Sequence, residues 1–277
     1  YSCQCAMPHG SPWNARRAFL LTATAAAATP ALAQVDVGDS SSMRKLVPAE
    51  TLENAATQQY DQLLAQAKAK GALAGANNPQ LIRLRAIAAK IVPFTYAWND
   101  RARGWKWEVN LIGSKQINAF VMPGGKIVFY TGILDQLQLT DDEIAMVMGH
   151  EMAHALREHA RERLAKSQVT GMGLSLGAQL LGLGDMGNLA ANLGTELLTL
   201  QYSRSDESEA DLVGLEIAAR AGYDPKAAIT LWQKMAKATG DKGGMAFLSS
   251  HPSGPNRIKE LEANLPKVES LYRRSPR

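Results

Sequence analysis

Cysteine is nearly absent from this chain of 277 residues, and Cys3 and Cys5 lie at its very start. Arg16 and Arg17 follow them, then an alanine-rich apolar run, then a small-x-small pattern that ends at Ala33. This order is typical of an export signal with an upstream extension, so we expect cleavage after Ala33 by the Sec or the twin-arginine route. The mature chain would contain no cysteine, which excludes disulfide bonds and a lipid anchor on a cysteine at the cleavage site.

Long hydrophobic runs and basic clusters are also missing. No uninterrupted apolar run reaches membrane length, and lysine and arginine are spread along the chain with a net charge of only +4. We therefore expect neither a transmembrane helix nor a nucleic-acid partner. The apolar stretch 169–200 is broken by glycines, and it predicts a mobile loop or helical hairpin that could touch a membrane surface peripherally.

Composition and periodicity predict an α+β domain that is mainly helical and carries a small antiparallel β-sheet. The expected parts are the export signal 1–33, a flexible mature N-terminus over 34–47, one folded domain over 48–266 and a basic C-terminal tail over 267–277. Helices are expected over 48–70, 79–92, 140–166, 205–221, 225–239 and 256–265, and strands over 105–112, 116–122 and 126–130.

The sequence His150-Glu-Met-Ala-His154 lies in a predicted helix that starts at Thr140, where a capping-box pattern with Glu143 occurs. Two histidines four residues apart lie about 40° apart around a helix, so both imidazoles can reach one cation. Glu151 between them points towards the open side of that cation. The pattern is typical of a hydrolytic zinc site, which needs a third protein ligand.

The best candidate for the third ligand is Glu207, which shares a helix face with Asp211 four residues later. Glu207 could bind the metal while Asp211 accepts the second ring N–H of a ligating histidine. Glu209 lies on the other side of the helix and is expected to be a solvated or salt-bridged surface residue. Without the histidine pair, this cluster would be interpreted as a charged helix surface.

Three further histidines need an interpretation. His251 lies on a proline-stiffened turn, and we consider three roles for it: an oxyanion donor, an inhibitory fourth ligand that excludes water, or a histidine that bonds a loop carbonyl. His159 lies too far around the continuous helix to join His154 at one metal, so we expect a surface residue. His9 belongs to the export signal.

The order of these motifs resembles that of the family-48 zinc metallopeptidases. The motifs are the His150–His154 sequence, Ser-Arg-x-x-Glu-x-Glu-Ala-Asp over 203–211 and His-Pro-Ser-x-x-x-Arg-Ile over 251–258. Asn-Ala-Phe-Val-Met-Pro-Gly-Gly over 118–125 is similar to the family's hairpin ahead of the zinc helix. The family comprises gluzincins such as CAAX prenyl, HtpX-like, Oma-type and periplasmic outer-membrane quality-control proteases, and the resemblance covers about 78–265.

The resemblance implies roles for individual residues. His150, His154 and Glu207 would bind one Zn²⁺ ion per chain, Glu151 would be the catalytic carboxylate, and Asp211 would support a ligand. The domain over 48–266 would then be the metallopeptidase domain. The membrane helices of the prenyl-protease and HtpX branches and the helical-repeat extension of some periplasmic members are missing, so small exported members are the most similar and prenylated substrates are disfavoured.

We therefore expect a periplasmic zinc metalloendopeptidase, either free or membrane-associated, that acts on unfolded or misfolded envelope proteins. A strand containing Asn118, Ala119 and Phe120 would bind extended substrate by edge pairing. The alternative is a chaperone or assembly factor for envelope proteins whose protease site is latent.

Overall fold

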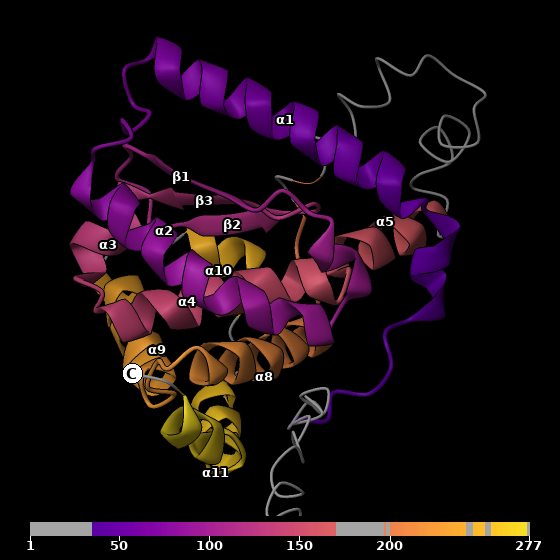
Figure 1. Cartoon of the computed structure of the whole chain (residues 1–277), viewed down its shortest axis with the longest axis vertical. Helices are drawn as coiled ribbons and strands as arrows, with labels where there is room; N and C mark the ends of the chain where they lie inside the picture. The colour runs from indigo at the N-terminus through magenta and orange to yellow at the C-terminus, as the bar shows by residue number, and fades with distance from the viewer. Residues whose placement is uncertain (1–34, 170–196, 198–199, 242–245, 253–255, 276–277) are drawn as a thin grey trace, which may run out of the picture. The chain divides into compact units, whose positions relative to one another are not determined.

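Helices make up most of the protein, with one small sheet among them (Figure 1). The structure is a computed structural model that describes residues 35–169, 197, 200–241, 246–252 and 256–275. These residues belong to one compact unit. The mainly helical α+β domain expected from the sequence is thereby confirmed.

The α-helices and strands have the following bounds. The helices are α1 (Ala49–Ala69), α2 (Pro79–Ile91), α3 (Thr131–Leu137), α4 (Asp141–Leu156), α5 (His159–Val169), α8 (Arg204–Arg220), α9 (Ala227–Asp241), α10 (Ala246–Ser250) and α11 (Arg257–Arg274). The strands are β1 (Glu108–Ile112), β2 (Ala119–Met122) and β3 (Lys126–Tyr130), and short 3-10 helices cover Ser42–Leu46, Val92–Ala97 and Asp100–Arg103.

The sheet has the strand order β1-β3-β2 and is mixed. The expected hairpin exists between β2 and β3, whose turn uses Gly124 and Gly125 at φ 84° and 79°. The expectation of a wholly antiparallel sheet is wrong, because β1 joins the other edge of β3 and runs parallel to it. As a result β2 is an edge strand in the part of the chain that the structure describes.

The backbone of β2 alternates between two directions. Tyr130 N–H donates to Asn118 O over 3.1 Å, and Gly125 N–H donates to Met122 O over 3.2 Å, so these carbonyls face β3. Because backbone direction alternates along a strand, the N–H and C=O groups of Ala119 and Val121 face away from β3. Val121 N–H donates to the Glu151 carboxylate, so the outer edge of β2 offers the N–H and C=O groups of Ala119 and the C=O group of Val121 to another chain.

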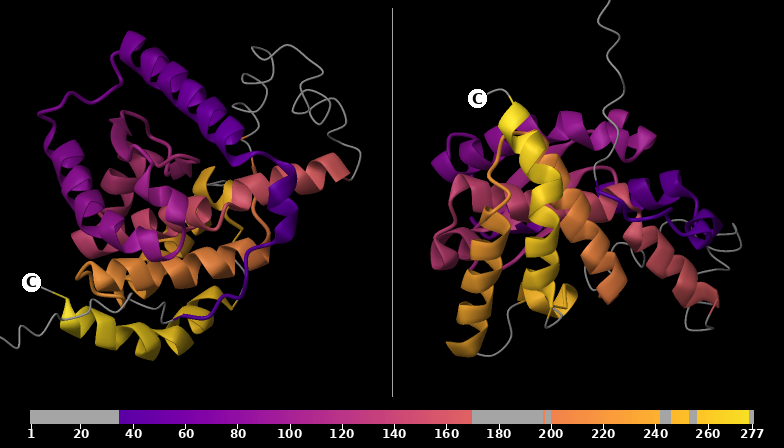
Figure 2. Two further views of the ribbon diagram at one scale, coloured as in Figure 1. Left: turned by 45° about the vertical axis from the view of Figure 1, so that its right-hand side comes forward. Right: turned by 90° about the horizontal axis from the view of Figure 1, so that it is seen from below.

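The elements lie in layers around α4. Helix α1 covers one face of the sheet, where Tyr60 packs with Met122 and Val128. Helices α2 and α4 lie against the other face, α8 packs on α4, and α11 lies beneath α8 (Figures 1 and 2). Every residue from Glu143 to Leu156 is buried, so α4 is the central helix of the domain.

Helix α4 begins where the sequence predicted and ends earlier. Thr140 Oγ accepts a hydrogen bond from Glu143 N–H, and the Glu143 carboxylate accepts one from Thr140 N–H, which confirms the capping box. The expected continuation to Lys166 is wrong, because Glu158 adopts a left-handed conformation at φ 58°. Ion pairs with Arg44 and Arg161 hold Glu158 there, and the chain starts α5 in a new direction.

Two glycines allow α4 and α8 to cross at very short range. A Cβ atom on Gly149 would lie 2.6 Å from Gly214 O, and one on Gly214 would lie 2.6 Å from His150 N. No larger residue fits without moving a helix. This crossing brings the acidic residues at the start of α8 to the histidines of α4.

Both ends of the described chain pack on the domain. Val35 is buried and its N–H donates to Glu216 over 2.9 Å, although we expected 34–47 to be flexible. Helix α11 runs to Arg274 with Val268 and Leu271 buried, so the tail expected from residue 267 is wrong as far as Arg274. Apolar residues at helical spacing continue beyond Leu265 and outweigh the cost of Pro266.

The apolar stretch 169–200 lies almost wholly outside the described residues. Within the described ranges, no helix combines the length and the apolar character that crossing a membrane requires.

Candidate metal centre

Four buried side chains bring one possible metal-binding atom each into a single cluster. They are His150, His154, Glu207 and His251, and their donor atoms all lie within 4.8 Å of one another. His150 Nε2 lies 3.1 Å from His154 Nε2, 3.3 Å from His251 Nδ1 and 3.5 Å from Glu207 Oε2. A tetrahedral zinc ion with bonds of about 2.1 Å separates its donors by roughly 3.4 Å. The donor types and their spacing therefore fit zinc.

The four donors come from three elements. His150 and His154 lie on α4 and Glu207 lies in the first turn of α8, whose start is fixed by a capping box of Ser203 and Asp206. His251 directly follows α10, where its N–H donates to Phe247 O over 2.8 Å and its ring stacks on the Phe247 ring. Its ring is thus held in place by a neighbouring aromatic side chain.

Asp211 and Arg257 support His150 from the side away from the cluster. Asp211 Oδ1 lies 3.0 Å from His150 Nδ1, and the Arg257 guanidinium binds both Asp211 oxygens at 2.6 Å. Arg257 also donates to Glu207 over 2.9 Å, and it stacks 3.6 Å above the centre of the Trp232 ring. Sequence reasoning assigned no role to Arg257, although this residue is part of the 251–258 motif.

The electrostatics of the cluster suit metal binding. Burial holds the pKa of His154 well below its ordinary value, so its imidazole is neutral and can bind a cation. Burial would raise the pKa of Glu207, but hydrogen bonds from His154 and His251 outweigh it and the pKa is lowered. The pKa of Asp211 is also lowered, because the charge of Arg257 outweighs its burial.

Glu151 differs from the other acids because one of its buried oxygens is unpaired. Its Oε1 has no hydrogen-bond partner among the described residues, and His251 Nε2 lies 3.4 Å from it. Burial is the largest influence on Glu151 and raises its pKa. Burial would lower the pKa of His251, but the charges of Glu151 and Glu207 outweigh it and the pKa is raised.

A cleft of about 440 Å³ opens beside this unpaired oxygen. Its lining includes Asn118, Phe120 and Val121 of the β2 region together with Glu151 and His251. Asn118 Oδ1 is the second buried oxygen without a partner in the described part of the chain. The expected substrate strand and the expected catalytic carboxylate thus border one cleft, and Ala119 is buried within that strand.

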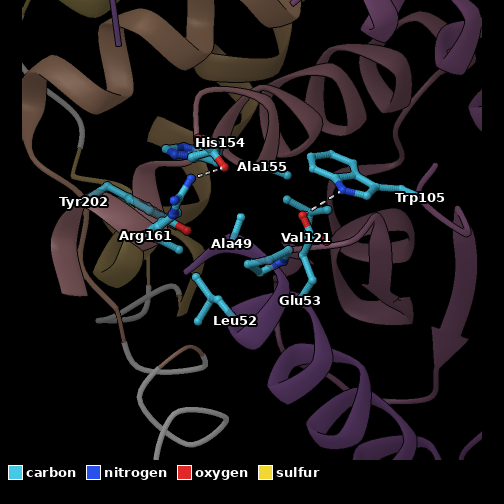
Figure 3. Close-up of a pocket in the computed structure, with 12 residues that line it drawn as sticks. Ala49, Leu52, Glu53, Trp105, Val121, His154, Ala155, Arg161 and Tyr202 are labelled. Atoms are coloured by element: carbon cyan, nitrogen blue, oxygen red, sulfur yellow. Dashed lines mark hydrogen bonds and ion pairs between the residues drawn. The ribbon is translucent and has the colours of Figure 1, made fainter. Parts of the chain in front are cut away.

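Tyr202 lines both the cleft and a smaller pocket that His154 also lines. The Tyr202 ring stacks on the His154 ring with centroids 3.9 Å apart. No sequence pattern indicated a role for Tyr202 at the site. Figure 3 shows the smaller pocket between Tyr202 and Trp105, where Trp105 Nε1 donates to Glu53 over 3.0 Å. Its free volume of about 20 Å³ holds roughly one water molecule.

The expectation that His159 is a surface residue is wrong. His159 is 2% exposed, and its Nδ1 lies 3.0 Å from His154 Nδ1. The reason is the break at Glu158, which turns α5 away from the axis of α4 and points the His159 ring back towards His154. Glu209 is salt-bridged, with Arg157 Nε at 2.8 Å and His159 Nε2 at 3.4 Å.

A helix-borne His-Glu-x-x-His sequence, a glutamate from a second helix and a buried outer shell of acids define the site as one of the zinc-peptidase class. Residues 82–265 match the profile of the family described as Peptidase family M48, and the chain belongs to this family. The resemblance expected from the motifs is confirmed, and zinc is the metal of this family.

Individual relatives agree with the family assignment. The chain is 39% identical over 166 residues to "Mitochondrial metalloendopeptidase OMA1" of Schizosaccharomyces pombe, covering 59% of this chain and 48% of the relative. It is 28% identical over 211 residues to "Metalloprotease LoiP" of Escherichia coli, covering 73% and 77%. It is 30% identical over 135 residues to "Beta-barrel assembly-enhancing protease" of Yersinia pestis, covering 46% and 27%. The chain spans about half the length of the OMA1 relative.

Proposed function

We propose that this protein is a zinc-dependent metalloendopeptidase that hydrolyses peptide bonds of unfolded or misfolded envelope proteins. The observation that carries the proposal is the unpaired, buried oxygen of Glu151 beside a zinc-like donor set and a cleft. His150, His154 and Glu207 are the proposed ligands of one Zn²⁺ ion, and Asp211 supports His150.

The chain's own residues divide the reaction between them. Zinc, when bound, supplies a Lewis acid that acidifies water and polarises a carbonyl. Glu151 Oε1 accepts a proton from the attacking water and later delivers it to the leaving amine.

The outer edge of β2 is proposed to hold the substrate as an added strand. The N–H and C=O groups of Ala119 and the C=O group of Val121 face away from β3 and are offered to a substrate, whereas Val121 N–H donates to the Glu151 carboxylate. Hydrogen bonds to the main chain tolerate different side chains. Asn118 Oδ1 offers a further acceptor to a substrate N–H. This mode of binding needs an extended chain, which supports unfolded or misfolded proteins as substrates.

Among the described residues the ring nitrogens of His251 contact the side chains of His150, Glu207 and Glu151 and no loop carbonyl, so two of its three expected roles are candidates at this site. Its Nδ1 belongs to the four-donor cluster, which supports an inhibitory fourth ligand, while its position on the cleft wall supports an oxyanion donor. The variant His251→Ala separates the two roles. Faster cleavage than wild type marks the inhibitory ligand, and slower cleavage marks the oxyanion donor.

The proposed location is the periplasm, either free or at a membrane surface. The export pattern that ends at Ala33 supports it, and one relative is named for enhancing β-barrel assembly. Envelope proteins are therefore the proposed substrate class.

The proposal is tested by casein hydrolysis with and without a chelator, together with metal analysis of the same samples. We expect one zinc per chain and hydrolysis that stops on chelation and returns with zinc. A folded Glu151→Gln variant that keeps its zinc and cleaves at the native rate would refute the assigned mechanism.

A second candidate function is a chaperone or assembly factor whose protease site is latent. It is favoured by the place of His251 in the donor cluster, where it would close the site to water. This function predicts that Glu151→Gln still binds client proteins and complements a deletion strain as well as wild type does. Failure of that variant to complement favours the peptidase.

A further inference from the structure

The two ring nitrogens of His154 have different surroundings. Nε2 faces the donor cluster, 3.1 Å from His150 Nε2 and 3.4 Å from Glu207 Oε1. A histidine that binds a metal through Nε2 carries its proton on Nδ1. The proton on His154 Nδ1 therefore needs an acceptor.

His159 supplies that acceptor. The Nδ1 atom of His159 lies 3.0 Å from His154 Nδ1, and a ring nitrogen can accept a hydrogen bond only if it carries no proton itself. A neutral imidazole without a proton on Nδ1 carries it on Nε2. His159 Nε2 faces Glu209 Oε2 at 3.4 Å, and the carboxylate accepts from it. Each donor and acceptor in this chain of contacts is thereby fixed.

Arg157 anchors the outer end of the chain of contacts. Its Nε donates to Glu209 Oε2 over 2.8 Å, and its Nη2 donates to Gly38 O over 2.8 Å. Glu209 is thus tied through Arg157 to the segment that precedes α1.

We infer that His159, backed by Glu209 and Arg157, is a positioning residue that fixes the tautomer and ring orientation of the metal ligand His154. The inference rests on the proposed function, since it assigns a role relative to the proposed zinc ion. It goes beyond that function because neither the motif nor the expected ligand set includes His159. The hydrogen bond that His159 makes to the ligand is to His154 Nδ1, the ring nitrogen that faces away from the donor cluster.

The break between α4 and α5 makes the contact possible. On one continuous helix, position 159 would lie about 140° around the axis from position 154. Glu158 at φ 58° ends α4 and redirects the chain, although left-handed backbone is unfavourable for a residue with a side chain. The redirection puts a third histidine behind the second ligand.

The test measures zinc affinity by competition with a chromophoric chelator, using the full chain. His159→Phe keeps a ring of similar size and removes the acceptor, and we expect affinity to fall roughly 10- to 100-fold. His159→Asn keeps an acceptor near the Nδ1 position and is expected to recover most of the loss. Glu209→Gln, which leaves His159 in place, is expected to lose a few-fold.

Leu164→Ala is the matched control for simple loosening of α5. Leu164 is fully buried on the same helix and contacts no donor of the cluster. We expect it to lower the melting temperature and leave zinc affinity unchanged. If Leu164→Ala weakens zinc binding as much as His159→Phe does, His159 has only a packing role and the inference is overturned.

Imidazole ¹⁵N spectra of the zinc-loaded protein provide a readout that a packing role would not produce. We expect the proton of His154 on Nδ1 and that of His159 on Nε2. A proton on His159 Nδ1 would overturn the inference. If wild type binds zinc and cleaves casein, and His159→Phe has the same zinc affinity and turnover, the inference is refuted and the proposed function is not. Wild type that binds no zinc refutes the proposed function and the inference together.

Discussion

The metal-ligand cluster has two unlike faces. We call the side behind the histidines, formed by Asp211, Arg257, His159, Glu209 and Arg157, the rear face. Each polar side chain there has a partner within 3.4 Å. We call the side formed by Glu151, Asn118 and the edge of β2 the front face, and it contains the two unpaired buried oxygens of the described residues. Burying an unpaired polar atom is costly, so the unpaired oxygens of the front face are suited to accept hydrogen bonds from a bound molecule. The paired groups of the rear face instead hold the metal ligands in place.

The rear face itself supports the two histidines in different ways. His150 contacts a carboxylate directly, whereas His154 reaches one through a second imidazole. Both routes end on an arginine. The Asp211 side chain is 9% exposed and that of Glu209 is 28% exposed, so water screens the second route more.

The largest effect is expected from a substitution on the front face. Glu151→Gln removes the proton acceptor and keeps the shape, so turnover should fall by about 10²- to 10⁴-fold. Zinc affinity should stay within a few-fold of wild type, because Glu151 is not a proposed ligand. Casein hydrolysis and chelator competition on the same preparation check both. The exposed Glu262→Gln is the control with the same chemical change.

The next largest effect is expected from a substitution on the rear face. Asp211→Asn removes the negative charge that accepts hydrogen bonds from His150 and Arg257. Zinc affinity should therefore fall roughly 10- to 100-fold. Turnover measured at saturating zinc should change much less than in Glu151→Gln. The drop should exceed that of Glu209→Gln, whose carboxylate is one residue further from the ligand. Equal losses in these two variants would contradict the difference between the two routes.

A smaller effect comes from moving α8, which carries the rear-face carboxylates Asp211 and Glu209, away from α4. Gly214→Ala places a Cβ 2.6 Å from His150 N, so the helices must separate and stability should fall by about 1–3 kcal/mol. Urea unfolding of the apo-protein measures this loss. Gly75→Ala has open space around its Cβ and serves as the control. If both variants are equally stable, the close crossing does not hold the helices in place.

The smallest expected effect lies at Glu143, away from both faces. Burial would raise its pKa, but Lys234, Thr140 and Thr230 together lower it, so its ionised form stabilises the fold. That contribution is complete above the unfolded pKa of about 4.3 and is lost as pH falls through the lower folded pKa. Glu143→Gln should cost about 1 kcal/mol at pH 7, and urea unfolding should give a smaller difference at pH 3. The same difference at both pH values would contradict this sign, and zinc affinity should not change.

Local sequence signals predicted the elements that carry the front-face carboxylate and the ligands. The capping box at Thr140 and the bounds expected for the helices over 79–92 and 205–221, which the structure gives to within one residue, depend on neighbouring residues, so they could be found without a fold. The i, i+4 spacing of His150 and His154 likewise fixes their common helix face. These features are all confirmed in the structure.

The rear face could not be predicted in the same way, because it depends on tertiary contacts. Arg157 and Glu158 are good helix formers, so nothing local signalled the left-handed residue that turns His159 inward. Arg257 and Trp232 are brought to Asp211 by the packing of α9 and α11. The parallel pairing of β1 with β3 is also non-local, and the alternation of side chains does not distinguish it.

The most direct test of the two-face description is metal analysis and casein hydrolysis on three purified proteins: wild type, Glu151→Gln and His150→Ala. We predict one zinc per chain in wild type and in Glu151→Gln, little or none in His150→Ala, and hydrolysis by wild type alone. Full zinc occupancy in His150→Ala, or native hydrolysis by Glu151→Gln, would contradict it.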